Sequence, residues 1–111
     1  MISSLENLVN IFSKMQSEGF DTNCPLKWGF YFVDTNKEKL ESVYDELKEK
    51  GYIKEEISKI IGEAKWMLHT SKIDTLTPEK LHKRNLAFND LADYCEIEIY
   101  DGWDVEKVST D

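Results

Sequence analysis

The fold of this chain is limited first by residues 27–33, Lys-Trp-Gly-Phe-Tyr-Phe-Val, a run that is almost entirely apolar or aromatic. Aromatic and β-branched residues favour strands, and a continuous apolar run is typical of a strand that is buried on both faces. A chain of 111 residues corresponds to about one domain with a single core. The run therefore predicts a central strand in the sheet of a one-core protein.

Before this strand, residues 3–17 have the pattern of an amphipathic helix. Their apolar side chains recur at three- and four-residue spacing, and Ser3 with Glu6 fits a capping box. Gly19 is expected to end the helix, and a loop then leads to Pro25. The sequence thus predicts an N-terminal helix and loop over residues 1–24 and a main domain over residues 25–111. The apolar stripe of the helix is Leu5, Leu8, Val9, Phe12 and Met15.

After the apolar run, four more segments show clear periodicity or helix-start signals. A capping box at Thr35 and Glu38 starts a helix that is expected to stop at Gly51. Residues 52–61 are a charged strand typical of a sheet edge, with Ile53, Ile57 and Ile61 expected on one side. Residues 64–73 are a third strand. Thr77-Pro78 then starts a helix that is expected to reach about Asp93.

With the last strand, the order of elements predicts an α+β fold, a ferredoxin-like four-stranded antiparallel sheet (βαββαβ) with two helices on one face. In this topology the first and third strands are central and the second and fourth are edges, which agrees with the apolar and charged patterns. The extra N-terminal helix is expected to lie across an edge or the open face of the sheet. A sheet face that stays uncovered would favour a homodimer.

The last strand is expected at residues 94–105, where Ile97 and Ile99 alternate with Glu96, Glu98 and Tyr100. This alternation predicts an apolar side on the core and an acidic side outward, and Asp101-Gly102 is a turn or bulge signal. Nearly all of the net charge of −8 lies here, since residues 89–111 carry a formal charge of −7. Such a surface attracts basic partners and repels nucleic acid phosphates. The acids are Asp90, Asp93, Glu96, Glu98, Asp101, Asp104, Glu106 and Asp111, against Lys107 alone.

The sequence offers little for catalysis, metal binding or RNA binding. His69 and His82 have no Cys or carboxylate at metal-ligand spacing, so neither a metal nor a cofactor is expected. Glu96 and Glu98 on one strand face would be about 7 Å apart, but solvated glutamates on an edge explain them better than a glycosidase pair. Arg84 is the only arginine, so direct nucleic acid binding is not expected.

The expected cellular compartment is inferred from the lack of a secretory signal pattern and of a membrane-spanning stretch in the sequence. The N-terminus lacks the pattern of a secretory signal, and no stretch approaches the roughly 20 apolar residues that a membrane span needs. We therefore expect a cytoplasmic protein with no membrane contact, whose Cys24 and Cys95 are reduced thiols.

Several of these segments together resemble the regulator of ribonuclease activity B family, the protein inhibitors of ribonuclease E. The resemblance is carried by Gly29-Phe30-Tyr31-Phe32, Glu49-Lys50-Gly51-Tyr52, Trp66 and above all Tyr100-Asp101-Gly102-Trp103-Asp104, and it covers about Lys27 to Val108. It implies a ferredoxin-like domain that is not an enzyme, binds the endonuclease outside its catalytic centre and alters which RNAs are cleaved.

The predicted partner site is the acidic segment, with Trp103 as apolar anchor. Its residues are Glu96, Glu98, Tyr100, Asp101, Gly102, Trp103 and Asp104. Two readings remain open for the partner. One is a basic segment of a ribonuclease, and the other is an unrelated basic enzyme that an immunity-type domain of the same fold would neutralise.

Overall fold

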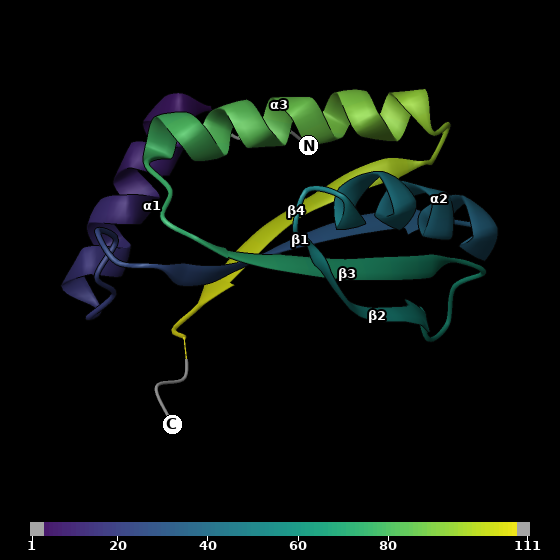
Figure 1. Ribbon diagram of the computed structural model, residues 1–111, viewed down its shortest axis with the longest axis horizontal. Coiled ribbons are helices and arrows are strands. Elements are labelled where there is room, and N and C mark those ends of the chain that lie inside the picture. Colours follow the sequence, from purple (N-terminus) through teal and green to yellow (C-terminus); the bar gives the residue numbers. More distant parts are fainter. Residues whose placement is uncertain (1–3, 109–111) are drawn as a thin grey trace.

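Four antiparallel strands in the order β2-β3-β1-β4 form the sheet of this protein in a computed structural model, which describes residues 4–108 (Figure 1). Both the α+β class and the ferredoxin-like arrangement are as predicted, with β1 and β3 central and β2 and β4 at the edges. The elements are α1 (Leu5–Ser17), β1 (Leu26–Asp34), α2 (Lys37–Lys48), β2 (Ile53–Lys59), β3 (Trp66–Asp74), α3 (Pro78–Tyr94) and β4 (Ile99–Glu106).

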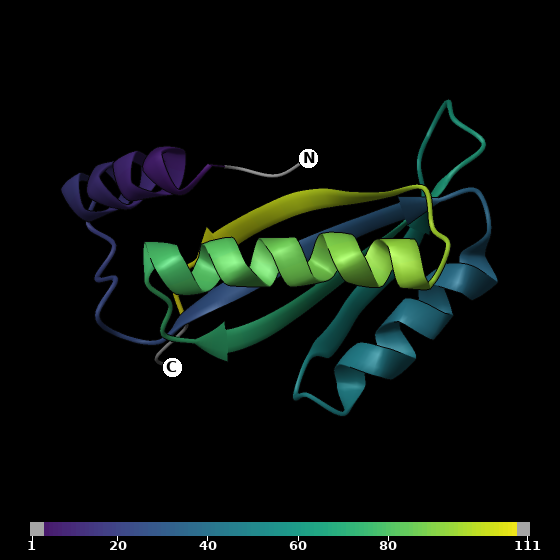
Figure 2. The same cartoon turned by 90° about the horizontal axis from the view of Figure 1, so that it is seen from above.

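Helices α2 and α3 cover one face of the sheet, and no helix within residues 4–108 lies on the other (Figures 1 and 2). The core lies under these helices. Trp28, Phe30 and Phe32 alternate along β1 and are completely buried. Phe88 of α3 packs edge-on against Phe30 at a centroid distance of 4.9 Å and against Tyr100 of β4 at 5.6 Å. Interlocked rings of this kind explain why an aromatic strand has to be central.

Helix α1 lies elsewhere than expected. Instead of crossing an edge or the open face, it packs against α3 and runs from the level of that helix down to the level of the sheet, at the end where β1 begins (Figure 1). Phe12 stacks on Trp28 at 5.7 Å, so α1 covers the part of the core face that α3 leaves bare. Its cap is Ser4, whose side chain accepts a hydrogen bond from the amide of Asn7. The proposed cap Ser3 lies outside the described residues, and the domain boundary at residue 24 stays a prediction.

Two local predictions in the middle of the chain are wrong. Asn36, and not Thr35, caps α2, because its side chain accepts from the amides of Glu38 and Lys39. In β2 the three isoleucines do not share a side. A register shift between Lys54 and Glu56 pairs Ile53 with Ser71 and Ile57 with Leu68, which places them on opposite faces. Ile61 lies in the loop after β2 and is 98% exposed.

The start of the last strand is also corrected. Helix α3 continues to Tyr94, Cys95 is its C-cap residue, and Glu96 has a positive φ of 56° just beyond it. Strand β4 begins only at Ile99. Ile97 is buried in the connection, while Ile99 is 38% exposed, so the predicted apolar side of this strand is wrong. The reason is that alternation gives a period but not the residue at which pairing begins.

Candidate functional site

The uncovered face of the sheet is the surface on which most of the predicted site residues lie. Residues of β1 that alternate with its core side chains point to this face, among them Lys27, Gly29, Tyr31 and Val33. Strand β4 runs beside them as the edge strand, so its outward side chains lie at the rim of the same face. We call this uncovered face of the sheet, together with its rim along β4, the open face.

A bulge in β4 decides which acidic residues reach the open face. Tyr31 pairs with Gly102, whereas the next residue, Phe32, pairs with Tyr100, so Asp101 is the extra residue. Gly102 has a φ of 111°, a conformation that glycine adopts at little cost. Tyr100 and Trp103 are three residues apart and would point to opposite faces of a regular strand, but the bulge lets both pack under the helices. The predicted turn or bulge at Asp101-Gly102 is therefore a bulge.

Asp104 is held against the centre of the open face. Its Oδ2 accepts a hydrogen bond of 2.6 Å from the hydroxyl of Tyr31, and Tyr31 stacks on His69 of β3 at 4.4 Å. Burial, and then the Asp104 carboxylate, raise the pKa of Tyr31 far above its usual value. This phenol therefore stays protonated and keeps donating to Asp104 throughout the physiological range.

Other carboxylates of the open face are partly neutralised by two lysines. Lys27 of β1 lies 3.0 Å from Glu55 of β2 and 3.3 Å from Glu106 of β4, so it links the two edge strands across the two central ones. Lys65, in the loop before β3, pairs with Glu98, and this carboxylate raises the pKa of Lys65. Exposed pairs of this kind add little stability, so they mainly order the side chains.

A cavity of about 500 Å³ opens beside the start of β4. Glu63, Glu98 and Asp101 supply carboxylates to it. Its apolar part comes from the end of β1, the loop after β2 and the first residue of β4. It thus combines negative charge with an apolar wall, which suits the stem and head group of a lysine or arginine side chain. The remaining lining residues are Val33, Ile60, Lys65 and Ile99.

The seven residues predicted as the partner site do not form one surface. Glu98, Asp101, Gly102 and Asp104 lie along the open face or its rim, whereas Glu96 lies at the end of α3. The two aromatic residues face the helices. Tyr100 is 1% exposed and donates a 2.6 Å hydrogen bond to Oδ1 of Asn85, and Trp103 is half-buried against Trp28 at 5.7 Å.

Sequence reasoning missed the contribution of the loop between β2 and β3. This loop protrudes next to the start of β4 (Figure 2), and Ile60, Glu63 and Lys65 complete the cavity. Among residues 4–108, Ile61 of the same loop is the most exposed large apolar side chain. Only the Gly62-Glu63 turn signal pointed to the loop, and it contained no information on which strand the loop would approach.

No group of three or more His, Cys, Asp or Glu side chains within residues 4–108 is suited to holding a metal ion. Over the same residues, no helix has the length and apolar character needed to cross a membrane.

The fold and the open face define the class of this protein, a small ferredoxin-like α+β domain with an acidic sheet surface and an additional N-terminal helix. A family model described as regulator of ribonuclease activity B matches residues 6–105. The chain therefore belongs to this family, whose proteins are non-catalytic regulators of ribonuclease activity. Membership implies that it binds a ribonuclease as protein partner. No individual curated protein matches the chain significantly.

The extent of this match corrects one expectation. The resemblance seen in the sequence began at about Lys27 and left the N-terminal helix outside, but the family model begins at residue 6 and includes nearly all of α1. The packing of Phe12 on Trp28 supplies the physical reason, because α1 closes the same core as the other helices.

Proposed function

We propose that this protein regulates an RNase E-type endonuclease by binding a basic segment of it, outside the catalytic centre, through the acidic part of the open face. The acidic surface comprises Glu63, Glu98, Asp101, Asp104 and Glu106. The observation that carries the proposal is the cavity of about 500 Å³, in which three carboxylates, against the single base Lys65, lie beside an apolar wall. A basic side chain can place its stem on the wall and its charge among the carboxylates.

The rest of the surface supports the same type of partner. Tyr31 holds Asp104 in place, so one acidic group is ordered before binding and less side-chain freedom is lost. Ile61 is fully exposed on the loop beside the cavity and supplies an apolar contact at its rim. Bound in this way, the protein changes ribonuclease activity without carrying out chemistry itself.

The test starts with the ribonuclease segment recovered by pull-down from the native host. Its affinity is measured by calorimetry for the wild type and for the double variant Glu98→Gln/Asp101→Asn, which keeps side-chain size and removes two charges. We expect a loss of at least about tenfold and a weaker salt dependence, because two charge-assisted contacts are removed. A cleavage assay of the ribonuclease should lose its response to the variant in parallel.

The matched control is Glu41→Gln/Glu46→Gln, which removes the same charge from exposed positions on α2. It should bind like the wild type. If both variants lose the same affinity for the ribonuclease segment, the effect comes from net charge alone. If Glu98→Gln/Asp101→Asn binds like the wild type, the acidic surface is not part of the interface. Recovery of an unrelated basic enzyme in the pull-down would support the immunity-type alternative instead.

A further inference from the structure

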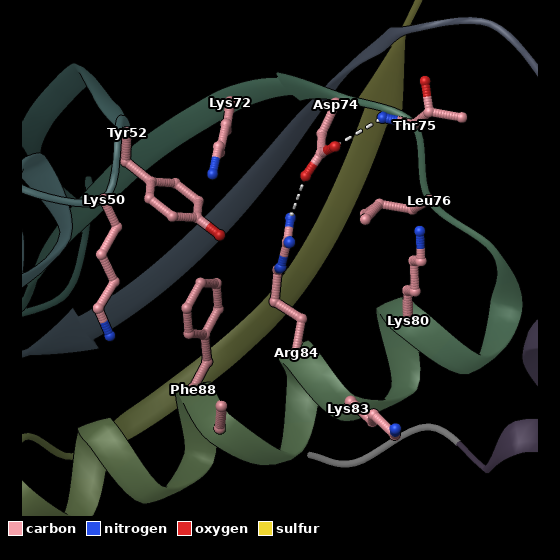
Figure 3. A pocket seen from close by; sticks show the side chains of 11 residues that line it. Lys50, Tyr52, Lys72, Asp74, Thr75, Leu76, Lys80, Lys83, Arg84 and Phe88 are labelled. Atoms are coloured by element: carbon pink, nitrogen blue, oxygen red, sulfur yellow. Dashed lines mark hydrogen bonds and ion pairs between the residues drawn. The ribbon is translucent and has the colours of Figure 1, made fainter.

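A basic pocket lies on the other side of the molecule, between α3, β3 and the connection from α2 to β2 (Figure 3). Its volume is about 530 Å³, within the range of pockets that hold small ligands. Lys72 extends from β3 toward α3, while Lys80 and Arg84 extend from α3 toward β3 (Figure 3). Lys50 and Lys83 complete the set, so five bases line the pocket against one acid, Asp74. In a chain with a net charge of −8, this is a local reversal of charge.

Most of these positive charges are not neutralised by the protein. Arg84 pairs with Asp74 at 3.2 Å, which accounts for the one acid of the pocket. Lys50, Lys72, Lys80 and Lys83 form no ion pair with any of the residues 4–108. Four ammonium groups around one cavity repel one another, and an anion placed between them would relieve that repulsion.

Local helix energetics do not explain Lys80 on α3. Thr77 caps this helix, so Lys80 lies in its first turn, where the positive end of the helix dipole disfavours a cation. Lys80 also lies three residues from Lys83 and four from Arg84, spacings at which like charges destabilise a helix. The last turn, where bases would be favoured, has none. Lys80 therefore lies where a cation costs stability, at the helix end whose dipole favours an anion.

The floor of the pocket is rigid and apolar. Tyr52, Leu76 and Phe88 are each at least 94% buried. The Lys72 ammonium lies 5.2 Å and the Arg84 guanidinium 6.0 Å from the centre of the Tyr52 ring. These contacts orient two cations before any ligand arrives, which lowers the entropy lost on binding.

We infer that this pocket binds a compact polyanion, a small molecule that carries at least two phosphate groups. The unpaired lysines would bind the phosphates, and the apolar floor would exclude water beneath them. A pocket of this size fits a small ligand better than an extended nucleic acid, whose phosphates would also meet the acidic residues elsewhere on the surface. The site is independent of the acidic surface, which lies on the opposite face of the sheet.

Inorganic tripolyphosphate is the probe, titrated into the full chain and followed by calorimetry and by amide chemical shifts. We expect saturable binding with shifts centred on residues 50–52, 72–76 and 80–88. The double variant Lys80→Gln/Lys83→Gln, at two exposed positions that line the pocket, should bind at least about tenfold more weakly. The control Lys14→Gln/Lys59→Gln removes the same charge far from the pocket and should bind like the wild type.

Three results would overturn the inference. One is a loss of tripolyphosphate affinity in the control variant as large as in the pocket variant, which would mean that the probe responds to net charge and not to the pocket. Another is an equal response to sodium sulfate at matched ionic strength. The third is tighter binding of a single-stranded oligouridylate than of tripolyphosphate, with affinity that rises with its length, since this would assign the bases to RNA. Saturable binding that the pocket variant alone loses supports the inference.

Discussion

The hydroxyl of Tyr31 on β1 donates a 2.6 Å hydrogen bond to Oδ2 of Asp104 on β4. Gly29, two residues before Tyr31, makes this possible, because a Cβ atom there would collide with Oδ1 of Asp104 and would lie 2.8 Å from Nε2 of His69. A carboxylate of the acidic surface is thus positioned by a residue that has no side chain.

Gly29→Ala should therefore displace the Asp104 carboxylate and destabilise the fold by about 1–3 kcal/mol, as overpacking usually does. Urea unfolding measures the effect. In an Asp104→Ala background the cost of the added methyl group should shrink, since its main obstacle is gone. Strictly additive free energies in this double-mutant cycle would contradict the proposed contact.

Tyr31→Phe should lower the free energy of unfolding by about 1 kcal/mol at neutral pH, the usual value of one hydrogen bond. The variant should also change the response to alkali. Because burial and Asp104 raise the pKa of Tyr31 in the folded state, the contribution of Tyr31 to stability is complete below its unfolded pKa and is lost as pH rises above it. The wild type should thus lose its advantage over Tyr31→Phe above about pH 10.

Urea unfolding at neutral and alkaline pH checks this prediction for Tyr31. Tyr94→Phe is the control, because Tyr94 is 77% exposed. Its stability should follow that of the wild type at every pH. A difference in the free energy of unfolding between the wild type and Tyr31→Phe that stays constant with pH would contradict the proposed link between the pKa of Tyr31 and stability.

Tyr100→Phe should destabilise the protein without weakening partner binding. The substitution leaves Oδ1 of the buried Asn85 without the 2.6 Å hydrogen bond, at a cost of about 1–3 kcal/mol. Calorimetry at a temperature where the variant stays folded should give the affinity of the wild type, because the side chain faces α3. A loss of affinity in the folded variant would return Tyr100 to the interface.

Trp103→Ala tests whether this residue is a partner anchor or part of the core. Its ring packs on Trp28, so we expect a loss of about 2 kcal/mol of stability, less than for a fully buried tryptophan. Trp103→Phe keeps a ring against Trp28 and should restore most of that stability. If the indole is also an anchor, the phenylalanine variant should still bind the partner at least about 1 kcal/mol more weakly. Wild-type affinity in this folded variant would leave Trp103 with a structural role alone.

Deletion of residues 1–20 should expose Trp28 and promote aggregation, because α1 closes one end of the core. A milder test is Phe12→Ala, with an expected cost of about 3 kcal/mol against less than about 1 kcal/mol for Val9→Ala on the exposed side of α1. Urea unfolding and light scattering provide the measurements. A deletion variant as stable and soluble as the whole chain would show that α1 is an independent element.

The order of the elements, the central place of β1 and the cap at Thr77 were all readable from the sequence. Burial on both faces requires a continuous apolar run, and a helix start requires a capping side chain at a defined spacing, so both features are local. A turn or bulge at Asp101-Gly102 was also readable, because glycine adopts a positive φ at little cost, but only the pairing with β1 makes it a bulge.

The faces of β4 and the composition of both surfaces were decided only by the tertiary structure. A strand that begins at Ile99 instead of Tyr94, with a bulge at Asp101, changes which side chains meet the core, and local alternation does not fix where pairing starts. The cavity by β4 and the basic pocket each join residues from three separated parts of the chain. Their charges meet because antiparallel pairing and helix packing bring distant segments together, and no local pattern in the sequence shows which segments will meet.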